Sequence, residues 1–176
     1  MKNKFIIKKK INSFNKIIRV SGDKSLSIRW VLLASLASGI SKSKNLLMSE
    51  DVLAAISAVK KLGIKVMFKK NICKIYGKGI NGFNYKKNLT INAKNSGTLG
   101  RLILGLIINS PYTIRMTGDK SLSKRDFKRI SDPLNKFGAK FNLKNNKTLP
   151  LKIKGSSHLN SIDYYEKKVQ LNVKAL

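Results

Sequence analysis

An internal repeat of about 75 residues is the feature that most limits what this chain can fold into. Three pairs of residues align when one half of the sequence is placed on the other: Arg29 with Arg101, Gly63 with Gly138, and Gly77 with Gly155. Each copy has the predicted order strand, helix, strand, helix, hairpin, and such alternation is typical of an α/β fold. We place unit one at about 17–80, unit two at about 88–156, and a truncated third unit at 160–176.

Unit one is read from its apolar periodicity and its turn residues. Its predicted elements are a strand at 16–20, a buried helix at 26–39, an amphipathic helix between Ser49 and Gly63, and a hairpin of 64–68 with 73–77. The first helix is predicted to be buried because it is apolar on nearly all sides. Ser49 is the expected cap of the second helix.

Unit two repeats this plan. Its predicted elements are a strand at 89–93, a buried helix at 99–110, a strand at 112–116, a helix from Phe127 to Phe137, and a hairpin of 139–143 with 149–155. Pro133 falls inside the apolar face of the second helix, so that helix is expected to be kinked or to begin late. Turn residues follow both helices of the unit, Pro111 after the first and Gly138 after the second.

The chain is strongly basic, with 37 Lys and Arg against 8 Asp and Glu and a formal net charge of +29. Such a charge predicts affinity for anions. Nucleic acid is one possible partner, but aromatic residues make up only 7% of the chain and no nucleic-acid-binding motif is found. A solvated basic surface is therefore favoured over an RNA-binding role, which stays open as an alternative.

Signals of compartment and of metal chemistry are few. Cys73 is the single cysteine, in a strand-like stretch, and is interpreted as a small buried hydrophobe. It leaves no internal disulfide and no cysteine-based metal site. No apolar run is long enough for a signal peptide or a membrane span, so a soluble, cytoplasmic protein is expected.

The hexapeptide GDKSLS occurs twice, at 22–27 and at 118–123. The copies are out of phase with the repeat, because the first precedes the first helix of unit one and the second precedes the second helix of unit two. The repeat counterpart of SGDKSLSIR is instead KNSGTLGR. Both of these loops lead into a buried helix, whose start offers free N–H groups to an anion. Lys24 adds a positive charge, although simple helix capping explains these residue types equally well.

Four segments together resemble the 5-enolpyruvylshikimate-3-phosphate (EPSP) synthase family, or 3-phosphoshikimate 1-carboxyvinyltransferase. They are VSGDKSLSIRWVLLASLASG, SEDVLAAISAVKKLGIKV, NSGTLGRLILGL and TGDKSLSKRDFKRISDPLNKFGAK. The resemblance implies an enolpyruvyl transferase domain, an inside-out α/β barrel with sheets outside and helices within. It also implies a monomeric enzyme of the shikimate pathway, which makes aromatic amino acids. That enzyme moves the enolpyruvyl group of phosphoenolpyruvate to shikimate 3-phosphate with no metal or organic cofactor.

The resemblance also implies the roles of individual residues. Shikimate 3-phosphate is expected to contact Lys24, Ser25 and Arg29, and phosphoenolpyruvate is expected to contact Lys24, Gly97 and Arg125. The residues expected to support the second loop are Asn95, Thr98 and Arg101. No catalytic acid or base of the family falls within this sequence.

The sequence departs from the family pattern at two places. Asp126 follows Arg125 where relatives usually have proline, and it is expected either to weaken the charge of that arginine or to cap a helix. In unit three, Gln170, Leu171 and Asn172 replace a Ser-Ala-Gln stretch, which puts a contact of Asn172 with shikimate 3-phosphate in doubt. His158, the single histidine, is interpreted as a solvated loop residue.

Family members are well over twice as long as this chain, and the resemblance implies a second domain with the proton-transfer residues. We therefore expect a substrate-binding fragment that is inactive alone. Residues 1–18 are expected to belong to the other domain and residues 19–176 to the first domain. Two alternatives stay open: a related transferase acting on a UDP-sugar, whose first loop does not usually read KSLSxR, and the basic RNA-binding protein.

Overall fold

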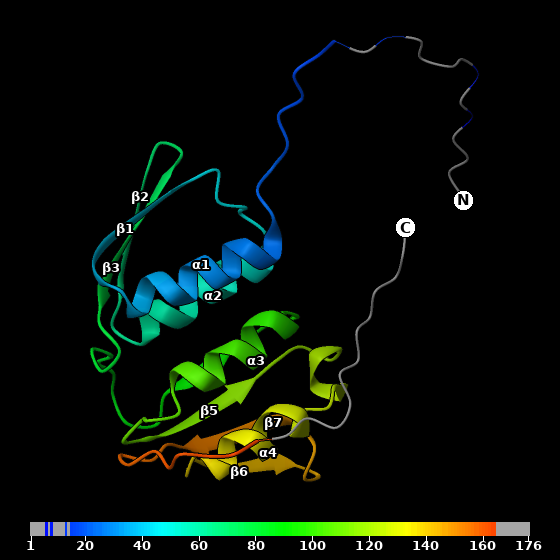
Figure 1. Ribbon diagram of the computed structural model, residues 1–176. Coiled ribbons are helices and arrows are strands. Elements are labelled where there is room, and N and C mark those ends of the chain that lie inside the picture. Colours follow the sequence, from blue (N-terminus) through cyan, green and yellow to red (C-terminus); the bar gives the residue numbers. More distant parts are fainter. Residues whose placement is uncertain (1–5, 7, 9–12, 14, 165–176) are drawn as a thin grey trace.

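The computed structural model describes Ile6, Lys8, Ser13 and residues 15–164 of the chain. The helices are α1 (Lys24–Leu36), α2 (Glu50–Lys61), α3 (Gly97–Leu106), the 3-10 turn η1 (Leu122–Lys124) and α4 (Lys128–Lys136). The strands are β1 (Ser38–Lys44), β2 (Lys65–Lys69), β3 (Ile72–Lys78), β4 (Thr90–Asn92), β5 (Thr113–Thr117), β6 (Lys140–Lys144) and β7 (Thr148–Lys154). Helices α1, α2 and α3 lie between two outer sheets (Figure 1).

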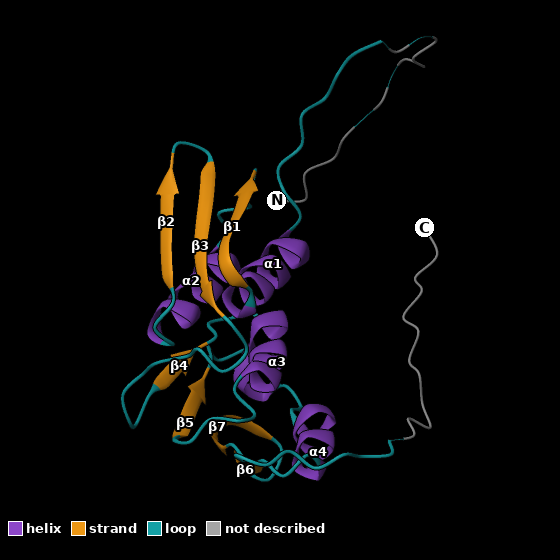
Figure 2. Ribbon diagram, turned by 60° about the vertical axis from the view of Figure 1, so that its left-hand side comes forward, coloured by secondary structure: helices purple, strands orange, loops and turns teal. Residues whose placement is uncertain are grey.

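Three strands of each sheet share one arrangement. The first has the order β1-β3-β2 and the second the order β4-β5-β7-β6. In each, the last two strands form an antiparallel hairpin, and the earlier strand, β1 or β5, pairs antiparallel with the second hairpin strand. Figure 2 shows α1 and α2 beside the first sheet and α3 between the two sheets. The mixed α/β class predicted from the sequence is confirmed, and the recurring strand order is what the repeat predicts.

The paired glycines occupy equivalent places in the two units. Gly63 and Gly138 both have positive φ, 86° and 107°, a backbone conformation that favours glycine, and each follows the second helix of its unit. Gly77 and Gly155 lie at the end of the second hairpin strand. There, a Cβ would collide with backbone just after the first helix of each unit, at Ala37 and at Ser110. Both sheets are therefore held against their helices through close backbone approach.

Two predictions for unit one are wrong. Residues 16–20 form no strand, and Ile17 is 97% exposed. A strand needs a paired neighbour, and in unit two the corresponding segment, β4, gains one by pairing in parallel with β5. Helix α1 ends at Leu36 and is not buried on all sides, because Leu26 and Leu33 are each 64% exposed.

The predicted cap of α2 is confirmed in position but not in its hydrogen bond. Ser49 lies at the N-cap position, but its side chain makes no capping hydrogen bond. Two further differences remain. The strand that the repeat requires between the helices of unit one was assigned no residues, and it is β1. The helix expected at 99–110 is the shorter α3, with a polar turn before Pro111. Helix α4 begins at Lys128 and continues through Pro133.

The core forms where the inner sheet faces meet the helices. Alternate residues of β3 and β7 are buried, and they pack against apolar faces of the helices. Cys73 on β3 belongs to this core, so its interpretation as a buried hydrophobe is confirmed. Burial raises the pKa of its thiol, and nearby Lys60 opposes that shift. Among the described residues, no helix is both long enough and apolar enough to cross a bilayer.

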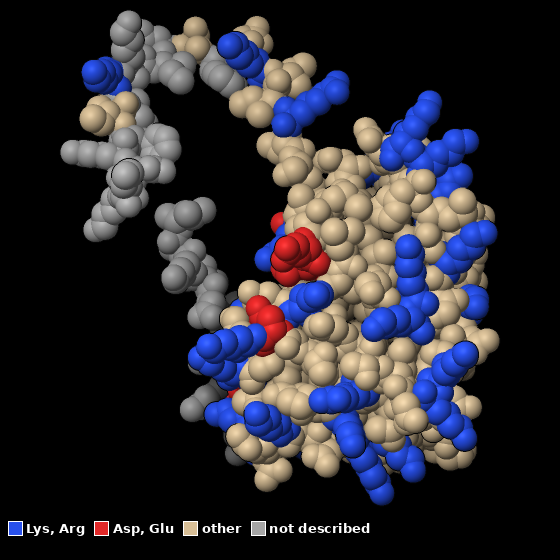
Figure 3. Space-filling model, turned by 180° about the vertical axis from the view of Figure 1, so that it is seen from behind, with Lys and Arg blue, Asp and Glu red and all other residues tan. Residues whose placement is uncertain are grey.

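Charge is unevenly distributed over this fold. None of the seven described strands contains Asp or Glu, whereas six of them carry Lys or Arg. Figure 3 shows Lys and Arg spread over the rear face, with the few acidic side chains near its left edge. In the described part of the chain, the acidic residues therefore lie in the helices and loops, and the outer sheet faces are cationic.

Candidate functional site

Three helix starts converge on one open hollow of about 510 Å³, which we call the cationic hollow. Its lining residues are Lys24, Glu50, Asp51, Asn95, Gly97, Thr98, Arg101 and Arg125. Lys24 begins α1, Glu50 begins α2 and Gly97 begins α3. Helix starts carry partial positive charge and unpaired N–H groups, so the hollow combines three such ends with three cationic side chains. This combination favours a small anion.

The first GDKS loop places Lys24 at the edge of the hollow. Asp23 caps α1, because its Oδ1 accepts a hydrogen bond of 2.6 Å from the amide of Leu26. Gly22 lies so close to the backbone of Asn45 that a Cβ would collide with it. The side chain of Asn45 donates to the carbonyl of Val20 at 3.3 Å. These contacts fix the chain direction into α1.

The second loop brings Gly97 and Arg125 together. Ser96 is buried and caps α3, accepting from the amide of Leu99 at 3.2 Å. Nη1 of Arg125 lies 2.7 Å from the point that a Cβ on Gly97 would occupy. A side chain at Gly97 would therefore displace the guanidinium from this position.

The second GDKS segment is hydrogen-bonded to the loop that leads into α3. The amide of Asp119 donates to the carbonyl of Lys94 at 2.8 Å, and Oδ1 of Asp119 accepts from the amide of Leu122 at 2.7 Å. Asp119 thus caps η1 as Asp23 caps α1. The two hexapeptides share this local capping, but only Lys24, and not Lys120, lines the cationic hollow.

Six of the residues singled out from the sequence line the hollow together. They are Lys24, Asn95, Gly97, Thr98, Arg101 and Arg125. Ser25 and Arg29 lie along α1, where Ser25 is half-buried and Arg29 exposed, and they are not among the residues that line it. Asn172, Gln170 and Leu171 lie outside the described residues. His158 is an exposed loop residue, as expected.

Sequence reasoning missed the two acidic residues of the hollow, Glu50 and Asp51. Asp51 forms an ion pair with Lys24, with 3.1 Å between Oδ2 and Nζ. Both acids look in the sequence like ordinary first-turn residues of a helix, which favour its positive end. Only the packing of α2 against α1 and α3 reveals that they face the cations.

The contacts of Asp126 are with Lys128 and Lys147 rather than with its neighbour Arg125. Its Oδ1 accepts a hydrogen bond of 2.7 Å from the amide of Lys128, at the start of α4, and its Oδ2 lies 3.4 Å from Nζ of Lys147. The hydrogen bond from the Lys128 amide, and then the Lys147 ammonium, lower the pKa of the Asp126 carboxyl. The helix-capping interpretation of Asp126 is therefore the one that its contacts favour.

We expect Asp126→Asn to destabilise the fold by about 0.5–1 kcal/mol near neutral pH, as loss of a charged helix-start contact does. Because the pKa is lowered in the folded state, this contribution is present above the unfolded pKa of about 4 and is lost as the pH falls through the folded pKa. Urea unfolding of both proteins between pH 7 and pH 2.5 measures it. A difference that persists unchanged at the lowest pH would contradict the charge-based origin.

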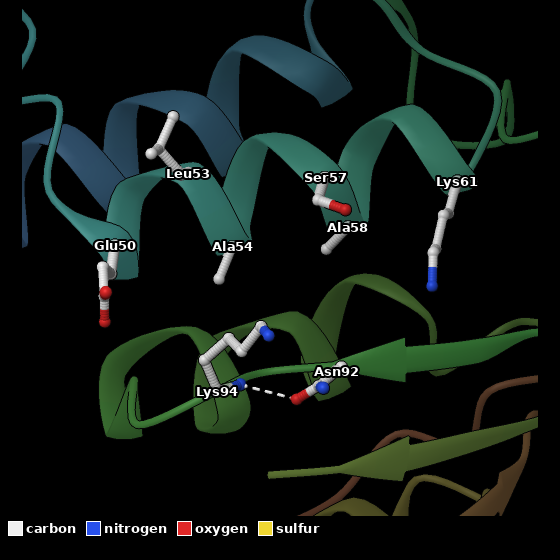
Figure 4. Close-up of a pocket in the computed structure, with 8 residues that line it drawn as sticks. All are labelled: Glu50, Leu53, Ala54, Ser57, Ala58, Lys61, Asn92 and Lys94. Atoms are coloured by element: carbon white, nitrogen blue, oxygen red, sulfur yellow. Dashed lines mark hydrogen bonds between the residues drawn. The ribbon is translucent and has the colours of Figure 1, made fainter. Parts of the chain in front are cut away.

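A second hollow, of about 480 Å³, lies between α2 and the end of β4. Figure 4 shows Ala54, Ser57, Ala58 and Lys61 pointing from α2 toward the segment with Asn92 and Lys94. Nζ of Lys61 donates to the carbonyl of Thr90 at 2.9 Å. The small side chains and this hydrogen bond lie at the interface between the two units, where α2 approaches unit two closely.

Comparison with known proteins gives consistent results. Residues 8–176 match the family model for EPSP synthase (3-phosphoshikimate 1-carboxyvinyltransferase). A protein of that enzyme name from Sulfurihydrogenibium sp. (strain YO3AOP1) is 38% identical over 168 residues, which are 95% of this chain and 38% of that protein. One from Ruthia magnifica is 42% identical over 163 residues, 92% of this chain and 37% of that protein.

Solved structures agree. An EPSP synthase structure from Acinetobacter baumannii superposes with a TM-score of 0.77 and 34% identity, covering 84% of this chain and 33% of that one. The chain thus spans less than two fifths of the length of these relatives. Because the family model matches nearly the whole sequence and the fold agrees, the chain belongs to the EPSP synthase family.

Proposed function

We propose that this chain supplies a substrate-binding part of an enolpyruvyl transferase that joins phosphoenolpyruvate to the 5-hydroxyl of shikimate 3-phosphate. The observation that carries the proposal is the cationic hollow, where three helix starts meet Lys24, Arg101 and Arg125. Both substrates are anionic phosphate esters. A site that binds them side by side must offset their mutual repulsion with fixed positive charge.

The reaction balances without a cofactor. The 5-hydroxyl oxygen gives up its proton as it bonds to C2 of phosphoenolpyruvate, and C3 takes up a proton, which gives a tetrahedral intermediate. Loss of a proton from C3 and of inorganic phosphate from C2 then restores the double bond. We assign none of these proton transfers to a residue of this chain and propose that its part is to bind and orient the substrates.

We assign the substrates to neighbouring parts of the site. Phosphoenolpyruvate lies beside Gly97, where the missing side chain lets the Arg125 guanidinium come close. Shikimate 3-phosphate lies along the first turn of α1, on Ser25 and Arg29, which are four residues apart and so share one helix face. Lys24 lies between these two groups and reaches both substrates. The match to EPSP synthase along the chain favours this assignment over a UDP-sugar acceptor.

Fluorescence of Trp30, the single tryptophan, tests the proposal because it neighbours Arg29 on α1. We expect shikimate 3-phosphate at millimolar concentration to change the emission, and Arg29→Ala to weaken its binding at least about tenfold, the loss of a charge-assisted hydrogen bond. Arg125→Ala should instead weaken the binding of phosphoenolpyruvate.

Arg115→Ala is the matched control, since it removes the same charge from the outer face of β5. We expect it to leave both affinities within about twofold, because surface charges at a distance are screened by salt. No response of the parent protein to either ligand, or equal losses in Arg115→Ala and Arg29→Ala, would reject the proposal.

A second candidate function is binding of RNA on the outer sheet faces. In three places like charges lie directly opposite one another on paired strands: Lys42 with Lys74, Arg115 with Lys152, and Lys140 with Lys154. Such pairs are unfavourable alone, and a polyanion across them would relieve the repulsion.

Anisotropy of a labelled single-stranded RNA decides between the two functions. Binding that falls steeply with salt and weakens in a Lys42→Gln, Lys74→Gln double variant would support this candidate, and its absence would dismiss it.

A further inference from the structure

The ion pair between Lys24 and Asp51 joins the starts of two helices at the cationic hollow. Oδ2 of Asp51 lies 3.1 Å from Nζ of Lys24, and the two side chains are 18% and 54% exposed. The Asp51 carboxylate is half-buried, so solvent screens this pair less than it screens two fully exposed charges. The contact also crosses from α1 to α2, two elements that the chain sequence separates by a strand.

A helix-dipole role alone does not account for the placement of Asp51. Any acid in the first turn of α2 interacts favourably with the helix start, and Glu50 already provides one, on an exposed side chain at the same end. Asp51 is the acid that is half-buried and that contacts Lys24. The helix dipole explains why an acidic residue occurs in the first turn of α2. The ion pair shows that the partner of Asp51 is the Lys24 ammonium.

The ammonium of a lysine is carried on a long chain with several rotatable bonds, so its position is poorly defined without a partner. Capping by Asp23 fixes the backbone of Lys24 but leaves the side chain free to turn into solvent. Asp51 supplies the missing constraint on the far end of that side chain. The backbone is therefore fixed by one acid and the charged head by another.

We propose that Asp51 is a positioning residue that holds the Lys24 ammonium at the cationic hollow for the anionic substrates. This inference rests on the proposed function for its ligand and deepens it, because it assigns a role within that site to a residue that the sequence motifs left out. A carboxylate so near an anion site repels the ligand directly. Removing Asp51 therefore has two opposing effects, and the sign of the net change separates them.

The experiment compares Asp51→Asn with Glu50→Gln in the full chain. Each variant removes one negative charge from the first turn of α2 and from the lining of the hollow, but only the first breaks the contact with Lys24. For phosphoenolpyruvate, we expect Asp51→Asn to weaken binding about fivefold, because ordering of the ammonium is lost. Glu50→Gln should tighten it by up to about twofold, because only repulsion is removed.

Two further variants keep the test decisive. Asp51→Glu retains the charge and should restore most of the affinity. In a Lys24→Met background, Asp51→Asn should no longer weaken binding, since the group that it positions is gone. Tightening by both acid variants alike, or the same loss from Asp51→Asn with and without Lys24, would overturn the proposal.

A second readout does not depend on substrate. The reaction rate of Lys24 with an amine-modifying reagent, followed by peptide mass mapping, should rise severalfold in Asp51→Asn and stay within about twofold of the parent in Glu50→Gln, because only the first frees the amine from its partner. If the parent protein binds no phosphoenolpyruvate, the proposed function fails, yet this rate still decides the inference. An unchanged rate for Lys24 in Asp51→Asn would refute the positioning role.

Discussion

Gly77→Ala is expected to destabilise the fold by at least about 3 kcal/mol, and Gly155→Ala by a similar amount, because neither site has room for a methyl group. At Gly77 the added Cβ would collide with the carbonyl oxygens of Ala34 and Ala37, and at Gly155 with the backbone of Ile108 and Ser110. These neighbours are main-chain atoms just before or after the end of a helix, so they cannot turn aside as a side chain can. Urea unfolding followed by circular dichroism measures the loss.

Gly105→Ala is the matched control for these two substitutions. Gly105 lies within α3, and nothing comes within 4 Å of the point that its Cβ would occupy. Alanine is the better helix former by about 0.5–1 kcal/mol, so this variant should be as stable as the parent or slightly more so. Unfolding curves that do not separate Gly77→Ala from Gly105→Ala would show that the close backbone approach is not maintained in solution.

The equivalence of Gly77 and Gly155 illustrates what the sequence could predict. Glycines that recur at equivalent places of a repeat are expected to serve the same backbone requirement, and the repeat then places the elements around them in the same order. Hairpins were predicted well because alternating apolar residues flank obvious turns. Lys70 and Asn145, at those turns, do have positive φ.

β1 shows what the apolar pattern could not reveal. Its sequence, SGISKSK, contains one large apolar residue and is exposed along most of its length. Pairing with β3 over seven residues holds it in place, and such pairing is invisible to a local pattern. Aligning it with β5 through the repeat would have identified it. The opposite error at 16–20 has the same origin, since that segment has strand composition but no paired strand among the described residues.

The candidate site could be predicted only in part for a similar reason. Lys24, Gly97 and Arg125 belong to recognisable motifs, and the fold brings them to one hollow. Asp51 belongs to a helix start whose acids have an adequate local explanation, so nothing in the sequence indicates its contact with Lys24. Contacts between elements that are distant in sequence are decided by packing, which periodicity describes only as a buried face.

Phe127→Ala is expected to cost about 3–5 kcal/mol of folding stability, the usual range for removing a large buried ring. Phe127 is fully buried, and its ring tip lies 3.4 Å from the point that a Cβ on Gly100 would occupy, so it fills the space between α3 and the start of α4. Its amide donates to the carbonyl of Lys147 at 2.9 Å. Arg125 lies two residues earlier on the same segment. Loss of the ring should therefore loosen the guanidinium at the cationic hollow as well as the core.

Two measurements separate these effects. Urea unfolding gives the stability loss, with Phe68→Ala as control, because Phe68 is 43% exposed and should cost less than about 1 kcal/mol. Phosphoenolpyruvate titration at low temperature, where the variant remains folded, reports on Arg125. We expect weaker binding in Phe127→Ala and unchanged binding in Phe68→Ala. Full stability loss with unaltered affinity would show that the Arg125 segment is held by its other contacts, chiefly the capping of η1 by Asp119.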